Sequence, residues 1–441
     1  MNILFLTHYF PPEVNAPATR TYEHCVRWAR AGHRITVVTC VPNCPDGRVY
    51  PGYLNRFPYQ VEWMDGLQVV RVWTYVAPNA GTFRRITNYV SYMASASLVG
   101  LRLARPDVVV ATSPQFFCGW AGVLVSRMKR APLVLEIRDI WPESIRAVGA
   151  IRSGILLRML ETLERKLYCA ADHVVTVGDG YRRHIVGKID KGIPVSVIPN
   201  GVDLERFSPR DPDPELRRQW GAEGKFVCSY VGTIGMAHGL EVVIEAARLL
   251  RQKGRDDIRF WLVGDGACRS QLADMARQAG VDEMVILPGR QAKERIPAVL
   301  ASSDACLVHL RKCALFEAVI PSKLFEMLAM VRPVIMGVPG PARRIVLRAC
   351  GGLTIESESP EALAVAVESL ADCPETTWQR NEWPRTYVAR HFSRDSLAAR
   401  YLDLLESVTA HGAWPTEAIE RGKRGRMAGG AAWETAGRRA A

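Results

Sequence analysis

Residues 310–333, LRKCALFEAVIPSKLFEMLAMVRP, bring together side chains suited to an anionic ligand. A basic pair, Arg311 and Lys312, opens the stretch. After a loop, Pro321 predicts the start of a helix with Lys323 in its first turn. The N–H groups and the dipole at a helix start favour an anion, and Glu326 adds a hydrogen-bond acceptor one turn later. The pattern predicts a site for a ligand with phosphate and sugar groups; the alternative is an exposed amphipathic helix behind a basic loop.

A second charged group, Arg138, Asp139 and Glu143, stands at and after the end of an apolar run at residues 133–138. Such a run predicts a strand buried on both sides. Charges at the end of a central strand need either a functional role or an ion pair of their own. These three residues are therefore the candidates for chemistry in the first half of the chain.

The chain that must position these groups has 441 residues, which is long enough for two domains. It is 48% hydrophobic and 23% charged, as in a soluble globular protein, and its net charge of +12 suits an anionic partner. No aromatic RNP pattern or zinc-finger spacing points to nucleic acid, so an anionic membrane or acidic small molecules lead. The 11 cysteines include no C-x-x-C pair, which argues against disulfides and structural zinc and favours a reducing, cytoplasmic compartment.

Neither a signal peptide nor a membrane span is predicted. The N-terminus MNILFLTHYF has no basic n-region and is expected to form a buried first strand. The run at 86–101 is uncharged, but its polar residues leave it short of the roughly 20 apolar residues that a span needs.

The first half alternates short apolar runs with helical patterns, which predicts a parallel sheet covered on both faces. A helix is expected at 19–31, and the loop at 40–59, rich in Pro and Gly, is expected to be mobile. The expected strands are residues 3–7, 35–39, 69–73, 108–112, 133–138, 173–177 and 195–198.

A second alternating set follows a polar, proline-rich linker, SPRDPDPE. Two doubly wound halves predict a cleft at the carboxyl ends of their strands. The expected strands are residues 226–231, 259–263, 284–287, 305–310, 334–337 and 353–355, and the expected helices are residues 240–252, 270–278, 293–301, 322–330, 342–349 and 361–370.

The predicted fold is therefore α/β, with Rossmann-like domains at 1–205 and 206–392. A helical pattern at 393–408 predicts a segment, 393–410, that packs back on the N-terminal domain. Residues 411–441 are expected to form a disordered basic tail, which is solvated or, as the alternative, touches anionic lipid.

Several motifs in order resemble glycosyltransferase family 4, the retaining nucleotide-sugar transferases of the GT-B fold, over about residues 1–410. The motifs are IPNGVDxxxF at 198–207, YVG at 230–232, VGDG at 263–266, LPGR at 287–290, SDACL at 303–307 and PSKLFE at 321–326. Their order and spacing carry the resemblance, which implies two Rossmann-like domains that face each other across a cleft.

A narrower resemblance is to the L-fucosamine-transferase-like branch of O-antigen, colanic acid and exopolysaccharide biosynthesis. It is carried by HYFPPE at 8–13, RDIWPES at 138–144, GTIGMAHGL at 232–240 and IPSK at 320–323. The branch implies a UDP-sugar donor, often N-acetylated or a related deoxy sugar, and a polyprenyl-diphosphate-linked acceptor.

The chain departs from the family at two places. The first glutamate of the usual E-x7-E pair would fall at Ala318, and Glu317 lies one residue out of register. The Arg and Lys that often hold the diphosphate are replaced by Thr233 and His238. The resemblance thus leaves the diphosphate to Lys323 and to the basic pair Arg311 and Lys312.

The resemblance implies that Glu326 binds the ribose and that Lys323, Arg311 and the Ser322 backbone bind the diphosphate. No D-x-D motif stands in a place suited to metal, so no metal or other cofactor is expected. Glycine at strand ends allows a ligand to approach the backbone closely, which adds glycines to the donor-side candidates. The remaining donor-side candidates are Gly232, Gly235, His238, Gly264, Asp265 and Arg290.

On the acceptor side, Asp139 or Glu143 is expected to orient the acceptor hydroxyl and Arg138 to meet a phosphate or a carboxylate. Retention in the family proceeds by front-face attack, in which the leaving phosphate can take the proton. The stretch 83–105, with two tyrosines and an arginine pair, is suited to an anionic membrane surface near a lipid-linked acceptor, or else forms a buried helix.

Two other functions compete with sugar transfer. A UDP-N-acetylglucosamine 2-epimerase would share the fold but needs an acidic pair and a histidine placed for proton transfer. A non-catalytic subunit of a polysaccharide assembly complex would be consistent with the absence of glutamate at Ala318.

Overall fold

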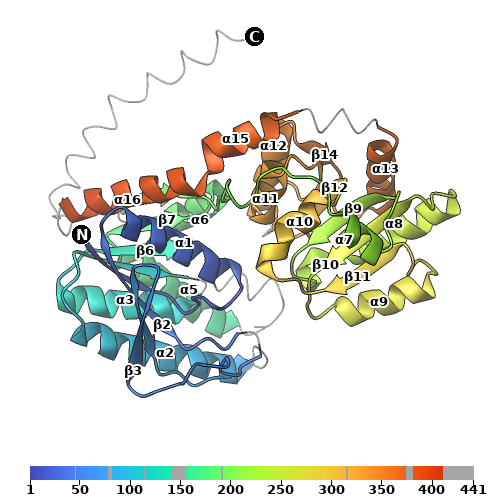
Figure 1. The fold of residues 1–441 in the computed structure, drawn as a ribbon. Helices are drawn as coiled ribbons and strands as arrows, with labels where there is room; N and C mark the ends of the chain where they lie inside the picture. The colour runs from blue at the N-terminus through green and yellow to red at the C-terminus, as the bar shows by residue number, and fades with distance from the viewer. Residues whose placement is uncertain are drawn as a thin grey trace, which may run out of the picture.

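The computed structural model describes residues 1–44, 46–77, 82–113, 115–141, 154–189, 192–313, 316–373 and 381–410. Two parallel sheets, each covered by helices, form the two lobes seen in Figure 1. The α/β prediction with two doubly wound halves is therefore confirmed. The expected tail at 411–441 and Glu143 lie outside the described residues.

The N-terminal sheet has the order β3-β4-β2-β1-β5-β6-β7-β8, and only β3 runs antiparallel to its neighbour. Its central strands are buried at every position, because helices cover both faces. The strands are β1 (Asn2–Leu6), β2 (Arg34–Cys40), β3 (Tyr59–Met64), β4 (Leu67–Val72), β5 (Val108–Thr112), β6 (Leu133–Ile137), β7 (His173–Thr176) and β8 (Val195–Val197).

The helices of this domain follow its strands along the chain. The side chain of Asn15 caps the first of them by accepting a hydrogen bond from the Ala18 backbone N–H, 2.9 Å long, and Pro17 stands in the first turn. The helices are α1 (Ala16–Arg30), α2 (Thr82–Arg102), α3 (Phe116–Lys129), α5 (Gly154–Cys169) and α6 (Asp179–Lys188).

The C-terminal sheet is entirely parallel, in the order β11-β10-β9-β12-β13-β14. Its strands are β9 (Phe226–Val231), β10 (Ile258–Val263), β11 (Val285–Gly289), β12 (Ala305–His309), β13 (Val334–Gly337) and β14 (Gly352–Thr354). Its helices are α7 (Pro214–Gln219), α8 (Glu241–Gln252), α9 (Arg269–Gln278), α10 (Ile296–Ala301), α11 (Lys323–Ala329), α12 (Pro341–Arg348), α13 (Pro360–Ala371) and α15 (Trp383–Phe392), with short 3₁₀ turns η1 (Met236–His238), η2 (Lys293–Arg295) and η3 (Phe316–Ala318).

The sequence patterns did not place several elements, among them β3, α7 and α15. Strand β3, YQVEWM, pairs with β4 through a tight turn at Asp65 and Gly66, both with positive φ, and its apolar residues alternate with polar ones. Helix α7 begins at the end of the segment predicted as a linker. Asp213, the second aspartate of the Asp211-Pro212-Asp213 sequence, caps it by accepting from two backbone N–H groups. Helix α15 was not predicted.

Helix α16 (Arg394–Ala410) returns from the C-terminal domain to the N-terminal one, where Figure 1 shows it along the lobe that contains α1. Its Tyr401 packs edge-on against Trp28, with ring centroids 5.2 Å apart. Trp28 in turn donates from Nε1 to the Ala398 carbonyl at 2.9 Å. The apolar face of the last helix is therefore buried against the first helix of the chain.

A buried ion pair joins α1 to the centre of the N-terminal sheet. Arg20 Nε lies 3.0 Å from Glu136 Oε1, and both side chains are almost fully buried. Burial alone would raise the pKa of the Glu136 carboxyl, but Arg20 and Arg138 hold that pKa below its ordinary value. Arg20 also donates to the carbonyls of Ile198 and Pro199, so it fixes the segment that leaves this domain.

Arg20→Met should lower the free energy of unfolding by about 3–5 kcal/mol, because it leaves the Glu136 carboxylate buried without its partner. The double variant Arg20→Met/Glu136→Leu should lose clearly less, because no unpaired charge remains. Urea unfolding followed by circular dichroism measures both. Equal losses in the single and double variants would contradict this account of the pair.

Candidate active site

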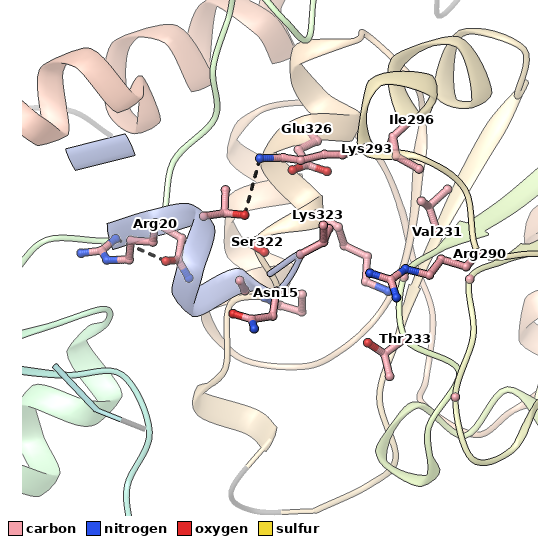
Figure 2. Close-up of a pocket in the computed structure, with 18 of the residues that line it drawn as sticks. Asn15, Arg20, Val231, Thr233, Arg290, Lys293, Ile296, Ser322, Lys323 and Glu326 are labelled. Carbon is pink, nitrogen blue, oxygen red and sulfur yellow. Dashed lines mark hydrogen bonds between the residues drawn. The ribbon is translucent and has the colours of Figure 1, made fainter. Parts of the chain in front are cut away.

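A cleft of about 1450 Å³ lies between the two domains. Its N-terminal wall comes from the start of α1, from residues 199–201, and from Cys44, Asp46 and Arg48. Its C-terminal wall comes from the ends of β9 and β10 and from the segments at 290–296 and 319–326. Figure 2 shows the side chains of Asn15 and Arg20 on one wall and those of Arg290, Lys293, Lys323 and Glu326 on the other. The cleft thus lies where the carboxyl ends of both sheets meet.

Three glycines let the backbone turns after β9 and β10 pack against each other. A Cβ on Gly264 would lie 1.8 Å from the Gly232 carbonyl oxygen, and one on Gly266 would lie 2.4 Å from that of Ile234. All three glycines have positive φ, at 145° for Gly232, 144° for Gly264 and 153° for Gly266. Only glycine fits this pair of turns, which therefore expose backbone to the cleft at Gly232 and Gly264.

Lys323 is the cation of the C-terminal wall. Its Nζ lies 3.5 Å from the centroid of the Tyr230 ring, and a Cβ on Gly232 would lie only 3.1 Å from it. This Nζ is buried and has no hydrogen-bond partner among the described residues. Burial lowers the pKa of Lys323 to about 7, although Glu326 opposes the shift. An anion in the cleft would supply the hydrogen-bond acceptors that the ammonium lacks.

The helix predicted at 322–330 is shorter in the structure. Helix α11 has seven residues, and Ser322 at its start has helical backbone angles and makes no side-chain cap. The dipole of so short a helix is small, so the attraction for an anion rests mainly on the Lys323 ammonium. Ser322 still lines the cleft beside it.

Glu326 lies one helical turn after Lys323 and lines the same cleft. Burial raises the pKa of Glu326, and the nearby Arg394 partly offsets the shift. Lys293 is a further neighbour of this carboxylate, and it reaches across the cleft to α1: its Nζ lies 3.5 Å from Thr19 Oγ1 and 3.8 Å from Glu23 Oε1 (Figure 2). Sequence reasoning missed Lys293, because its partners are more than 260 positions away.

His238 and His309 hold the turn η1 at the edge of the cleft. The His309 ring accepts the Glu358 N–H at Nε2, 2.8 Å away, so its Nδ1 donates to the His238 carbonyl, 2.7 Å away. His238 lines the cleft, and burial, with the nearby Lys323 second, lowers its pKa to about 4. Its imidazole is therefore neutral near pH 7. Gly235 accepts from the His238 backbone and thereby shapes this turn.

The basic pair that precedes the loop lies away from the cleft lining. Arg311 is paired with Glu241 at 2.7 Å and with Glu358 at 3.4 Å, and it also donates to the Met236 carbonyl. Lys312 is paired with Glu356 at 2.7 Å. Arg311 thus fastens the η1 turn that carries His238. By contrast, Asp265 and Arg290, predicted on the donor side, both line the cleft.

The structure places Ala318, where the first motif glutamate would fall, against the other domain. A Cβ on Gly180 of α6 would lie 2.6 Å from the Ala318 Cβ, so the η3 turn packs directly on that helix. Glu317 is exposed, and its backbone carbonyl packs on Gly340. Because Glu317 is not among the residues that line the cleft, it does not take the place of the missing glutamate in this arrangement.

Arg138 and Asp139, predicted to act on the acceptor, do not line the cleft between the domains. The Arg138 guanidinium donates to the carbonyls of Ala16 and Pro17 at 3.2 and 3.3 Å, where it steadies the start of α1. Asp139 lines a narrow crevice beside Phe116 and Trp141. With Glu143 outside the described residues, their roles toward an acceptor stay predictions.

The loop after β2, expected to be mobile, is pinned by hydrogen bonds. The buried Glu13 accepts from the backbone N–H groups of Asn43 and Cys44, both at 2.9 Å. The Tyr50 hydroxyl donates to the Cys44 carbonyl at 2.6 Å. These bonds fix Cys44, which lines the cleft together with Asp46 and Arg48.

Metal-binding groups do not gather in the cleft. Among the described residues, no three His, Cys, Asp or Glu side chains lie close enough together to hold a metal ion. The charged side chains that line the cleft are arginines, lysines and carboxylates that are not grouped for metal binding, above all Lys323 and Glu326.

Both halves of the chain match glycosyltransferase family models. Residues 15–201 match the Glycosyl transferase 4-like domain, and residues 212–383 match Glycosyl transferases group 1. The boundary between the two matches falls between Gly201 and α7. The first match covers the N-terminal sheet except for β1, and the second covers the whole C-terminal sheet, so the resemblance read from the sequence motifs is confirmed.

Full-length relatives agree with these matches. The putative colanic acid biosynthesis glycosyl transferase WcaI of Escherichia coli is 28% identical over 91% of this chain and 99% of its own. A GDP-mannose-dependent alpha-mannosyltransferase of Mycolicibacterium smegmatis is 26% identical over 84% and 88% of the two chains.

Solved structures share the fold. HepE of Anabaena, in complex with UDP and glucose, superposes with a TM-score of 0.68 at 16% identity over 92% of this chain and all of its own. WaaG, a glycosyltransferase involved in lipopolysaccharide biosynthesis, superposes with a TM-score of 0.66 at 16% identity over 91% of this chain and 99% of its own. The predicted GT-B fold is confirmed.

Gly180→Ala should loosen the contact between α6 and the η3 turn, because the added Cβ meets Ala318 at 2.6 Å. Hydrogen–deuterium exchange should speed up in residues 316–321. Gly187→Ala, on the same helix with open space around it, is the matched control and should stabilise α6 by about 0.5–1 kcal/mol. Unchanged exchange in Gly180→Ala would show that the two domains do not rest on this contact.

Proposed function

We propose that this chain, which belongs to the glycosyltransferases that join a 4-like domain to a group 1 domain, is a retaining hexosyltransferase that uses a nucleoside-diphosphate sugar. The observation that carries the proposal is the buried Lys323 ammonium, which has no hydrogen-bond partner among the described residues and faces the cleft beside Glu326. The Lys323 ammonium lacks a hydrogen-bond acceptor, which a diphosphate would supply. The Glu326 carboxylate can accept hydrogen bonds, which ribose hydroxyls would donate.

Lys323 and the two glycine turns would bind the diphosphate. The ammonium would neutralise charge that grows on the leaving diphosphate as the sugar bond breaks, which is where a fixed cation is most effective. Gly232 and Gly264 have no side chain between backbone and cleft, so the phosphate oxygens can approach closely. We propose transfer without a metal, because the protein itself supplies a cation at this position.

Glu326 would accept hydrogen bonds from the ribose hydroxyls. Its raised pKa reflects burial, and two hydroxyl donors would stabilise the carboxylate form there. The nucleotide base would then extend toward Arg290 and Gln291, which line the same cleft, with Arg290 near Cys44 of the N-terminal wall. Lys293, between Glu326 and α1, would tie nucleotide binding to the position of the N-terminal domain.

In the proposed reaction the acceptor hydroxyl attacks the anomeric carbon on the face that the diphosphate leaves. The bond from that carbon to the diphosphate oxygen breaks while the new glycosidic bond forms, and the leaving phosphate takes the hydroxyl proton. No protein base is needed for this balance. The neutral imidazole of His238, at the cleft edge next to Lys323, is placed to hydrogen-bond the sugar or the phosphate.

We propose a UDP-sugar donor, N-acetylated or a related deoxy sugar, and a lipid-linked glycan acceptor of a bacterial surface polysaccharide. The relatives support the class: one is named for colanic acid biosynthesis, and WaaG for lipopolysaccharide biosynthesis. HepE binds UDP, whereas the mycobacterial relative uses GDP-mannose, so the nucleotide is decided by experiment. No helix among the described residues is long and apolar enough to cross a membrane.

Incubation with UDP-N-acetylglucosamine, UDP-glucose or GDP-mannose, in buffer containing EDTA, should release nucleotide from a UDP-sugar. Glu326→Ala should weaken UDP binding at least about tenfold, as expected for a lost pair of charge-assisted hydrogen bonds. Glu317→Ala is the matched control and should bind UDP like the wild type, since Glu317 is exposed outside the cleft lining. No turnover with any donor, together with no UDP binding by calorimetry, would remove the transferase proposal and favour a non-catalytic subunit.

UDP affinity should fall as the pH rises above about 7, because Lys323 loses its proton near that pH in the free protein. Below pH 7 the ammonium is already present; above it, binding must take up a proton, which costs up to about tenfold in affinity per pH unit. The measurement is calorimetry from pH 6 to 9 on the wild type and on Lys323→Met. Comparing the two proteins cancels the effect of pH on UDP itself, because that effect is common to both. The wild type and Lys312→Met should share the decline, and an equal decline in Lys323→Met would rule out this role.

A further inference from the structure

An apolar stripe runs along the solvent side of α2. Residues 86, 90, 94, 98 and 102 recur at helical spacing and are all exposed. The first four are Ile, Val, Ala and Leu, and the last is Arg. The tyrosines expected to face a membrane do not belong to this stripe: Tyr92 is buried, with its hydroxyl 2.9 Å from the carbonyls of Thr7 and Val38, and Tyr89 is half-buried. The exposed apolar side of the helix is thus opposite to its aromatic side.

Helix α3 continues this surface. It packs beside α2, where a Cβ on Gly100 would lie 2.9 Å from Val125, and it exposes Leu124 and Met128. We call the outward sides of the two helices the α2–α3 face. Its large apolar side chains and their exposed fractions are Ile86 44%, Val90 39%, Leu98 55%, Leu124 46% and Met128 61%.

The charge on both helices has one sign. The sequence from 82 to 105 and from 115 to 131 contains no Asp or Glu. The basic residues of these two segments are Arg84, Arg85, Arg102, Arg105, Arg127, Lys129 and Arg130. Exposed apolar residues alone do not identify a partner, but apolar stripes combined with unopposed cations match the interface of an anionic bilayer.

The edge of the sheet extends the same surface. Strand β3 pairs with β4 so that Val61 lies opposite Val70, on the sheet face that α2 covers. Trp63, two residues on, shares that face and is strongly exposed. Figure 1 shows β3 and α2 together at the lower edge of the N-terminal lobe. Tryptophan is favoured where a bilayer meets water.

We propose that the α2–α3 face docks this protein on an anionic membrane. Helix α2 follows β4 and α3 follows β5, so both helices begin at the carboxyl end of the sheet, where the loops that line the cleft also lie. Docking through this face sets the N-terminal wall of the cleft next to the lipid surface. The purpose of the docking rests on the proposed function, since a lipid-linked acceptor would then reach the cleft without leaving the bilayer.

Flotation of the full chain with phosphatidylcholine vesicles, with and without phosphatidylglycerol, tests the proposal. The wild type should float with the anionic vesicles and be released by high salt, because salt screens the cations. Arg84→Glu/Arg85→Glu and, separately, Leu98→Ser/Leu124→Ser should each lower the bound fraction by about tenfold or more.

Matched changes on the other domain are the controls. Arg343→Glu/Arg344→Glu on α12 makes the same change of net charge at exposed positions. Leu347→Ser/Val365→Ser removes apolar side chains that are 54% and 59% exposed. Both control variants should float like the wild type, and all four should keep their circular dichroism spectrum and their elution volume in gel filtration.

Three results would overturn the docking surface. They are unchanged flotation of both α2–α3 face variants, an equal loss in the control variants, and a wild-type dimer that these face variants convert to monomer without a change in flotation. The last result would assign the face to contact between copies of this chain. UDP binding is measured in solution without vesicles, so its absence would contradict the proposed function and leave the flotation result standing.

Discussion

The site depends on one costly arrangement, a buried lysine ammonium without a hydrogen-bond partner among the described residues. Lys323 is held over the face of the Tyr230 ring, which can repay about 2 kcal/mol of its desolvation. The remaining cost shows as a pKa lowered to about 7. A site that keeps a cation in this state is prepared for an anion, because the ligand restores the interactions that burial removed. The glycine turns beside it leave their backbone open to the cleft.

The N-terminal domain is fastened to this site from two sides. On one side Lys293 reaches Thr19 and Glu23 on α1, and on the other Ala318 packs on Gly180 of α6. Two arginines anchor helix α1. Arg20 pairs with Glu136 of the sheet, and Arg138 donates a hydrogen bond to the first turn of the helix. Arg138, which was predicted to meet a phosphate or a carboxylate, thus holds the start of the helix that forms the opposite wall of the cleft.

The departure from the usual glutamate pair has a structural counterpart. Where a glutamate would reach toward the cleft, this chain has a small residue that allows two domains to touch. The second glutamate, Glu326, and Lys323 both line the cleft. This chain therefore keeps the second glutamate of the pair in the cleft and lacks the first.

Sequence alone determined the two sheets and the spacing of Lys323 and Glu326. Apolar runs that recur between helical patterns define buried parallel strands, and the PSKLFE motif sets Lys323 and Glu326 one helical turn apart. Tertiary structure decided the rest, because it depends on partners far apart in the chain. Arg311 pairs with Glu241 and Glu358 outside the cleft lining, and Lys293 is drawn to α1. Which of several cations remains for the ligand follows from which of the others find carboxylates when the chain folds.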